Sequence, residues 1–182
     1  MHPPAIEQLT YLDQQRVILR AAFLAVPPPL REQAPAPGRW SAAGVIEHLA
    51  IVERQLARRL HEDIAKARGE GLGPKQEAGP VLPTLNTAIE RLLDWNTRFE
   101  ASAAVCPTGQ SADAPWAALE EAGNRVRDAL KAGDGLALGS RFLPHRVFGQ
   151  MSLYYYFAFV GAHEARHAIQ IREIATEMSV VE

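Results

Sequence analysis

Hydrophobic residues recur at intervals of three and four along most of the chain, and this spacing predicts α-helices. The clearest case begins at Trp40-Ser41, where Ser41 is a suitable N-cap, and continues to Arg68-Gly69. Its apolar positions are Val45, Leu49, Val52, Leu56 and Leu60. An amphipathic helix of this kind should bury one face against other helices.

Three further long segments have the same helical spacing. They run from Pro3-Pro4 to Pro27-Pro28-Pro29, from Asp113 to Gly133, and from about Gln150 to Glu177. A weaker pattern over 85–99 predicts either a short extra helix or an irregular excursion. Glycine and proline are concentrated in 69–83 and 133–149, which predicts long loops. No segment has a convincing strand pattern.

Four long helices joined by loops predict an all-α protein, a four-helix bundle with long loops and room for one short extra helix. The 182 residues are enough for one domain with a sizeable core and short for two. We therefore expect a single domain over 1–182. In such bundles, sites are built from side chains that project between facing helices.

Composition and charge narrow the class of partner. The chain is 47% hydrophobic and 22% charged, with a formal net charge of -2 and no long block of like charge. That balance argues against nucleic acid or an anionic membrane as the main partner and favours a small molecule. The single cysteine, Cys106, excludes an intrachain disulfide. The N-terminus lacks the order of a signal peptide, and the apolar run 153–162 is too short to span a bilayer, so we expect a cytoplasmic protein.

Two histidines four residues apart mark the last predicted helix. His163 and His167 lie about 40° apart on one face. They belong to a stripe about 80° wide that also contains Tyr156, Val160, Gln170 and Ile174. Such a stripe on a mostly apolar helix should face the interior, where an unpartnered imidazole is costly. A metal ion is one partner that would satisfy both rings.

A third histidine lies where it could face the same interior. His48 falls about 60–80° from the centre of its helix's apolar stripe, on the flank and not on the solvent side. Three neutral histidines around one ion leave a coordination position open for water or substrate. Glu164 lies about 60° from His167 and is a candidate general base. On the residues alone, a packed polar side chain is the commoner role for each of these histidines.

The remaining histidines and the cysteine are weaker candidates for a metal ligand or a nucleophile. His2 and His61 have the character of surface residues, and the role of His145, beside Pro144, is open. Cys106 precedes a proline in an irregular segment with no histidine nearby in sequence. We therefore favour a small, partly buried cysteine over a nucleophile.

Three short motifs follow one another along the chain. Residues 40–53 begin with Trp-Ser and contain a histidine followed by Leu-Ala, and residues 144–149 read Pro-His-Arg-Val-Phe-Gly. The last helix carries His163-x-x-x-His167-x-x-Gln170-Ile171. Together, in this order and spacing, the motifs resemble the DinB/YfiT-like superfamily of bacterial four-helix bundles. In that family the loop is Pro-His-Pro-x-x-Gly, so Arg146 here replaces its second proline.

The resemblance covers nearly the whole chain and implies an up-down-down-up bundle with a divalent metal held by His48, His163 and His167. Zn or Ni is the first expectation, with Fe or Mn as alternatives. Better-understood relatives use the metal to activate a low-molecular-weight thiol and transfer its sulfur to an electrophile; others are described as hydrolases. Dimers are common among relatives, so a homodimer is expected. Gln170 is placed to hydrogen-bond a metal-bound histidine, and Tyr156 either lines the pocket or packs in the core.

Two other functions fit parts of this pattern. The run His163-Glu164-Ala165-Arg166-His167 matches the His-Glu-x-x-His pattern of zinc metalloproteases. Only the 15 residues 168–182 follow it, without a histidine, and no strand precedes it, so a zincin-like protease is a minor alternative. The main alternative is a non-catalytic bundle that is stabilised by its metal or binds a small molecule.

Overall fold

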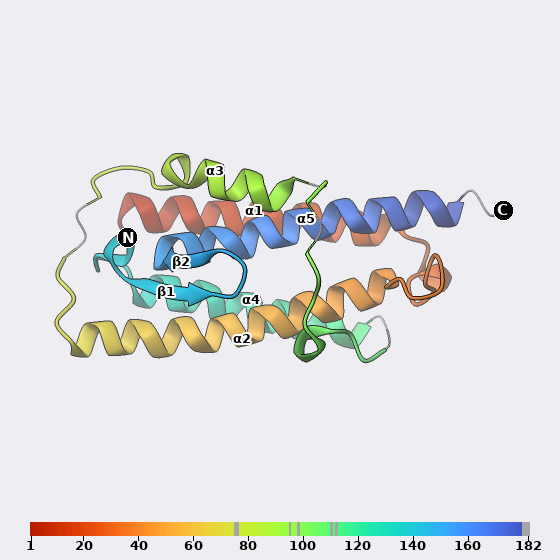
Figure 1. Ribbon diagram of the computed structural model, residues 1–182, viewed down its shortest axis with the longest axis horizontal. Helices are drawn as coiled ribbons and strands as arrows, with labels where there is room; N and C mark the ends of the chain where they lie inside the picture. Colours follow the sequence, from red (N-terminus) through yellow and green to blue (C-terminus); the bar gives the residue numbers. More distant parts are fainter. Residues whose placement is uncertain (75–76, 95, 98, 110, 112, 180–182) are drawn as a thin grey trace.

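The computed structural model describes residues 1–74, 77–94, 96–97, 99–109, 111 and 113–179. Four long helices run lengthwise along it (Figure 1): α1 (Pro3–Ala25), α2 (Ala42–Gly69), α4 (Asp113–Ala132) and α5 (Leu153–Ser179). α1 and α5 run in one direction and α2 and α4 in the other, which is the up-down-down-up order. The predicted all-α bundle is confirmed. No helix in the described part of the chain is long and apolar enough to cross a membrane.

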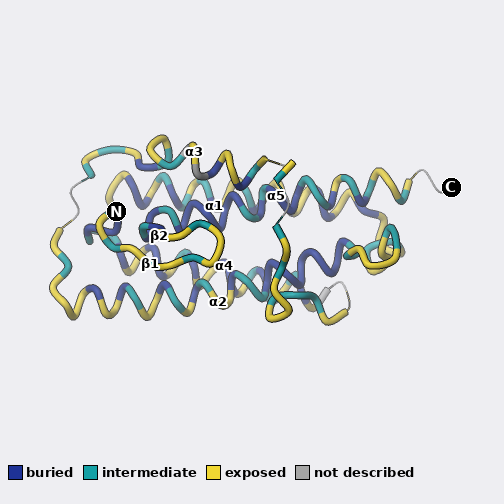
Figure 2. Tube along the Cα trace, in the orientation of Figure 1, coloured by how far each residue is buried: buried dark blue, intermediate teal, exposed yellow. Residues whose placement is uncertain are grey.

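The four helices pack mainly as two parallel pairs. α1 lies on α5, and α2 lies on α4. Buried residues follow the inward side of each helix and exposed residues the outward side (Figure 2). Two apolar clusters fill the described interior: one includes Tyr156 and Phe157, and the other includes Ile46, Leu49 and Ile171. This inward burial is the arrangement that apolar spacing of three and four residues predicts.

The helix ends follow signals that are visible in the sequence. The Ser41 hydroxyl accepts a hydrogen bond from the Gly44 backbone N–H at 3.0 Å, which caps α2 as predicted. Pro3 and Pro4 occupy the first turn of α1, where a missing backbone N–H costs nothing. Pro27 follows the end of α1 and cannot continue it. Single 3-10 turns lie at Pro28–Leu30, Ala103–Val105 and Leu138–Ser140.

A shorter helix and an irregular crossover cover one side of the bundle. α3 (Leu82–Leu93) packs against α5, and the chain that follows it crosses to α2 (Figure 1). The predicted extra helix therefore exists, but it ends well before residue 99. Its end is marked by Asp94, whose carboxylate accepts hydrogen bonds from the Asn96 backbone N–H at 3.0 Å and the Thr97 hydroxyl at 2.6 Å. We call residues 94–109 the crossover segment.

A β-hairpin lies directly before α5, and the sequence pattern did not predict it. β1 (Phe142–His145) pairs antiparallel with β2 (Gly149–Ser152). We predicted a loop over 133–149 and a helix from about Gln150. Both predictions were wrong at this point, because the hairpin occupies the segment and α5 begins at Leu153.

Tertiary contacts, and not local pattern, hold this hairpin. Strands of four residues are too short to display a period of two, and Pro144 lowers the strand signal further. Met151 of β2 is fully buried against the bundle. The Tyr156 hydroxyl of α5 donates a hydrogen bond to the Pro144 carbonyl at 2.8 Å, which fixes β1 to the helix.

Candidate metal centre

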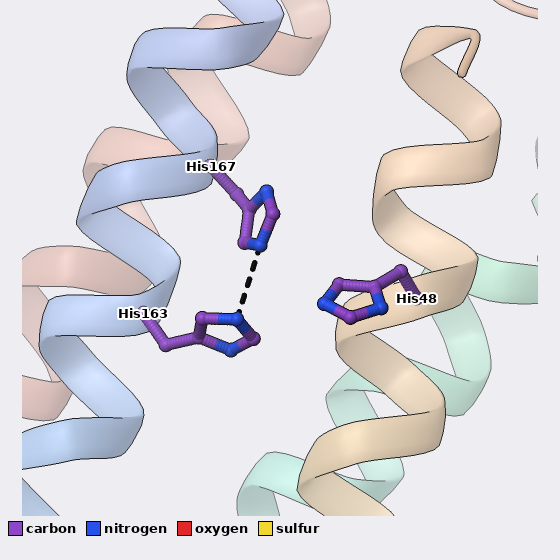
Figure 3. A group of neighbouring side chains, drawn as sticks. All are labelled: His48, His163 and His167. Carbon is purple, nitrogen blue, oxygen red and sulfur yellow. Dashed lines mark hydrogen bonds between the residues drawn. The ribbon is translucent and has the colours of Figure 1, made fainter. Parts of the chain in front are cut away.

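Three histidines from two helices converge between α2 and α5 (Figure 3). His48 projects from α2, and His163 and His167 project from successive turns of α5. The Nε2 atoms of His163 and His167 are 3.0 Å apart, and one ring nitrogen from each histidine lies within 4.8 Å of the others. The structure thus brings together the three residues that the sequence nominated as ligands.

Hydrogen bonds determine which ring nitrogen of two histidines faces the centre. Nδ1 of His48 donates to the Val105 carbonyl at 2.8 Å, and Nδ1 of His167 donates to Oε1 of Gln170 at 2.7 Å. Because a carbonyl oxygen only accepts, each Nδ1 carries the proton and each Nε2 keeps its lone pair. Both rings are therefore oriented as metal ligands are, with the outer nitrogen anchored and the inner one available.

Aromatic side chains hold two of the rings from the side. The Trp40 ring lies 4.9 Å from the His48 ring, centroid to centroid. The Phe159 ring stacks on the His163 ring at 5.3 Å with an interplanar angle of 15°. These contacts restrict ring rotation, so the site is organised before any ion binds.

Burial keeps the three imidazoles neutral. Removal from water lowers the pKa of His48, holds the pKa of His163 well below its usual range, and lowers the pKa of His167 to about 3. The positive charge of Arg166 adds to this effect at His163 and His167. Neutral imidazole is the protonation state that binds a metal, so no ring has to lose a net proton at neutral pH. Because His167 Nε2 carries no proton, His163 Nε2 donates the 3.0 Å hydrogen bond between the two rings, and binding of an ion at that nitrogen requires the proton to move to His163 Nδ1.

The metal-free protein should lose stability as the pH falls from about 7 to about 5. The folded-state pKa values of the three histidines lie below the value of about 6.5 in an unfolded chain, so the unfolded chain binds protons that the folded chain does not. Their contribution is therefore complete above about pH 6.5 and is lost below it, by at most about 2 kcal/mol per histidine. Urea unfolding of chelator-treated protein at the two pH values measures the loss. Changing His163 and His167 to Gln should flatten this dependence, and an unchanged pH slope in that variant would contradict the explanation.

The donor set fits a divalent transition metal. In tetrahedral geometry, two nitrogens that bind one ion at about 2.0–2.1 Å lie about 3.3–3.4 Å apart. The pair on α5 is close to this spacing at 3.0 Å, and the three nitrogens lie within 4.8 Å of one another, so side-chain shifts of at most roughly 1.5 Å complete the set. Imidazole nitrogen suits Zn, Ni and Fe. His48, His163 and His167 are therefore the residues that would hold the ion.

A buried carboxylate next to His48 ties the crossover segment to α2. Glu47 is 3% exposed, and its two oxygens accept hydrogen bonds from the backbone N–H groups of Thr108 at 2.9 Å and Gly109 at 3.0 Å. The neighbouring His48 bonds Val105 of the same segment. Two successive residues of α2 thus fix the chain that covers the histidine.

Arg166 ties the other end of the crossover segment to α5. Its guanidinium is buried and donates to the backbone carbonyls of Leu92 at 2.7 Å, Asp94 at 2.9 Å and Thr97 at 2.6 Å. It also lies 4.9 Å from the centre of the Phe99 ring. Because Arg166 stands between two of the ligands in sequence, the same helical turn that presents them also positions the cover of the site.

The centre lies in the wall of a cavity of about 640 Å³. All three histidines line it, and its other walls are rich in aromatic side chains: Trp40, Phe99, Phe148 and Phe159. This volume is within the range of small-molecule sites, about 300–1,000 Å³. A second hollow of about 710 Å³ lies farther along α5 beside Glu177 and shares Gln170 with the first. The histidines are thus accessible to a small molecule.

Glu164, the candidate base, lies outside the cavity. Its carboxylate is 1% exposed and forms a two-pronged ion pair with Arg16 of α1, at 2.8 Å from Nη2 and 3.1 Å from Nε. Arg16 Nη2 also pairs with the buried Glu53 of α2 at 2.9 Å. The structure does not bring Glu164 to the histidines, so a zinc-protease mechanism lacks the glutamate that it requires.

Gln170 and Tyr156 have different surroundings. Gln170 lines the cavity and accepts the hydrogen bond from His167, which is the contact that the hypothesis for this residue needs. Tyr156 is fully buried in the apolar core, and its hydroxyl bonds the Pro144 carbonyl and accepts from Arg59 at 3.3 Å. Of the two roles considered for Tyr156, the structure supports packing.

Several residues of the site were not nominated by the sequence. Glu47 and Arg166 gave no signal, because their partners lie far away in the chain. His145, whose role was open, lines the cavity, whereas His61 is exposed as expected for a surface residue. The Cys106 thiol donates to the Ser102 carbonyl at 3.5 Å, and the residue is partly buried, as expected.

Comparison with known proteins gives one family and a distant relative. A family model described as the DinB superfamily matches residues 11–171, a range that includes all three histidines. The uncharacterized protein YuaE of Bacillus subtilis (strain 168) is 24% identical over 147 residues, which cover 78% of this chain and 81% of YuaE. None of the solved structures matches the chain significantly.

Proposed function

This chain belongs to the DinB superfamily, and from that premise we propose that it is a metal-dependent enzyme acting on a small electrophile. The attacking group is a low-molecular-weight thiol or a water molecule, so the activity is that of a thiol S-transferase or a hydrolase. One observation carries the proposal: three neutral imidazoles, two of them with an anchored outer nitrogen, meet in the wall of a cavity large enough for a substrate. A centre that served stability alone would not need such a cavity.

The chain's own residues divide the work of the site. His48, His163 and His167 would hold a divalent ion, Zn or Ni before Fe or Mn. When bound, the ion would lower the pKa of a thiol or water in its open position and so supply a nucleophile at neutral pH. Gln170 orients the His167 ring, and Glu47 holds the crossover segment over His48. The apolar walls exclude bulk water and receive the body of the substrate.

This division of roles does not need a carboxylate base beside the metal. Glu164 is engaged by Arg16, and among the described residues that line the cavity the one acid is the exposed Glu100. His145 Nδ1 accepts hydrogen bonds from the backbone N–H groups of Val147 at 3.1 Å and Phe148 at 3.2 Å, so that nitrogen is not free to accept a substrate proton. Activation by the ion fits this distribution of groups better than general-base catalysis does.

We also propose a cellular location and an oligomeric state for the protein. We place the activity in the cytoplasm, since a single cysteine suits a reducing compartment. A homodimer is proposed from the family alone, because no residue pattern in this chain demands it.

Turnover by the metal-loaded protein tests the proposal. Protein reconstituted with Zn or Ni is mixed with cysteine, coenzyme A or glutathione and an electrophile such as chlorodinitrobenzene, and loss of free thiol is followed. Hydrolysis is followed in parallel with chromogenic esters. We expect a rate at least about tenfold above that of a His167→Ala variant, a difference of about 1.4 kcal/mol in barrier. Wild-type rates equal to those of the variant across both panels, with metal bound, would favour the non-catalytic alternative.

A further inference from the structure

The end of the cavity away from the three histidines is lined by arginines. Its α2 wall runs from His48 through Val52 and Leu56 to Arg59. Arg59 follows His48 by 11 positions (59 minus 48), which is about 16 Å along the helix axis. Arg146, in the turn between β1 and β2, lines the same cavity. The cavity is therefore elongated, with metal-ligand chemistry at one end and positive charge at the other.

Arg59 has no carboxylate partner among the described residues. Its Nη1 donates to the Tyr156 hydroxyl at 3.3 Å, and its guanidinium lies 5.4 Å from the centre of the same ring. Of the two acids within one turn further along α2, Glu62 lies 4.0 Å from Arg58, and Arg141 takes both oxygens of Asp63, at 3.0 and 2.9 Å. A half-buried guanidinium whose hydrogen bond within the described part of the chain goes to a neutral phenol keeps most of its capacity to bind an anion.

Arg146, which lines the cavity from the hairpin, also has a neutral hydrogen-bond partner. Its Nη2 donates to the backbone carbonyl of Glu100 at 3.0 Å, a neutral acceptor, and no ion pair to it is found in the described part of the chain. Arg39, another arginine of the cavity, differs because Glu177 pairs with it at 2.6 Å. Arg59 and Arg146 thus line the cavity without an ion pair among the described residues, and the exposed Glu100 is the one acid in the described lining.

His145 lies at this end and adds a hydrogen-bond donor. Its Nδ1 already accepts two backbone hydrogen bonds, so in the neutral ring the proton is on Nε2. Burial lowers the pKa of His145, and the positive charges of Arg59 and Arg146, which line the same cavity, lower it further. The groups at this end therefore donate hydrogen bonds and carry positive charge.

Aromatic rings connect the two ends. The Phe148 ring lies 5.1 Å from that of His145 and 5.9 Å from that of Phe159. Phe159 stacks in turn on the ligand His163. A molecule that spans the cavity would meet apolar surface in its middle, the three histidines at one end and the two arginines at the other.

We infer that the cavity binds an elongated organic anion, with its carboxylate or phosphate on Arg59 and Arg146 and its apolar body along Phe148 and Phe159. The anion site is independent of turnover, but its use for a substrate rests on the proposed function, which places the reacting end at the histidines. Guanidinium groups recognise carboxylate and phosphate through the same paired N–H donors, so either anionic group could bind at the two arginines.

Binding of three matched probes tests this inference. Phenylbutyrate carries a carboxylate, phenylpropyl phosphate carries a phosphate, and phenylbutyramide is the neutral counterpart of the first. Each is titrated calorimetrically into the metal-loaded protein and into the His167→Ala variant, whose centre is disabled. We expect at least one anion to bind at least about tenfold more tightly than the amide in both proteins. The tighter anion identifies which of the two groups the site prefers.

Variants of the cavity arginines show where the anion binds. Arg59→Gln should weaken anion binding about tenfold or more and leave the amide unchanged. Arg58→Gln is the matched control, because it removes the same charge from the same helix at an exposed position. Arg146→Gln, in an exposed turn, should also reduce the preference, and it decides the matter if Arg59→Gln fails to fold.

The outcomes separate the inference from the proposed function. Equal binding of anions and amide would overturn the anion site, as would an anion preference that survives in both arginine variants. A preference that disappears only in His167→Ala would place the anion on the metal, and this too would overturn the site. An anion preference that depends on Arg59, found together with no turnover in the thiol and ester assays, would support the anion site while the proposed function fails.

Discussion

Replacing His167 with Ala is expected to reduce bound metal from about one equivalent per chain to none. The Nε2 atoms of His167 and His163 are 3.0 Å apart, so the change removes half of the closest ligand pair. The two remaining histidines on different helices would not hold an ion through purification, because two neutral ligands bind far more weakly than three. Elemental analysis of wild type and variant, purified and reconstituted side by side with Zn and Ni, measures the difference.

Two further variants make this experiment specific. His61→Ala removes an exposed histidine from α2 and should leave the metal content unchanged. Gln170→Leu keeps all three ligands but removes the acceptor at His167 Nδ1, so we expect metal affinity to fall by about 10–100-fold. Full metal content in His167→Ala, or no metal in the wild type after reconstitution, would remove the basis for a metal centre at these residues.

Replacing Arg16 with Met is expected to destabilise the protein by about 3–5 kcal/mol. Arg16 is 7% exposed and pairs with two carboxylates that are each 1% exposed, Glu53 and Glu164. Its Nη1 also donates to the Leu119 carbonyl at 3.1 Å, so one side chain of α1 contacts α2, α4 and α5. Methionine fills much of the space but leaves a buried carboxylate without its counter-charge.

Glu53, the second acid bound by Arg16, provides the matched control for Arg16→Met. Burial and the nearby charge of Glu164 raise the pKa of Glu53 well above its usual range, against the opposing effect of Arg16. A raised pKa favours the protonated acid, which an amide resembles, so Glu53→Gln should change stability by less than about 1 kcal/mol. Thermal unfolding should show a midpoint lower by about 6–20 °C in Arg16→Met and little change in Glu53→Gln. A loss of less than about 1 kcal/mol in Arg16→Met would show that the ion pair between Arg16 and Glu164 does not stabilise the bundle.

The helices could be predicted because their signals are local. The spacing of Leu49, Val52 and Leu56, the cap at Ser41 and the prolines at both ends of α1 all act within a turn or two of the residue concerned. The three histidines could be nominated for a related reason, because helical geometry places His163 and His167 on one face. The position of His48 on the flank of its helix's apolar stripe made it a possible third ligand, and the family resemblance then joined it to the pair.

The predictions failed where local pattern carries little information. The hairpin of β1 and β2 depends on the burial of Met151 and on the bond from Tyr156 to Pro144, neither of which leaves a period in four-residue strands. Glu164 was a candidate base because helical geometry places it about 60° from His167. Its carboxylate is instead held by Arg16, which lies 148 positions away in the chain.

The sequence by itself determined the class of the molecule and its candidate metal ligands: an all-α bundle with histidines on inward faces. The tertiary structure alone decided how the polar groups pair. It placed Val105 and Gln170 on the outer nitrogens of two ligands, Glu164 on Arg16, and Arg59 at the far end of the cavity. The physical reason is the distance along the chain over which each signal acts. Periodicity and capping are set by neighbours within one or two helical turns, whereas the partner of a buried charge is set by whichever distant segment packs against it.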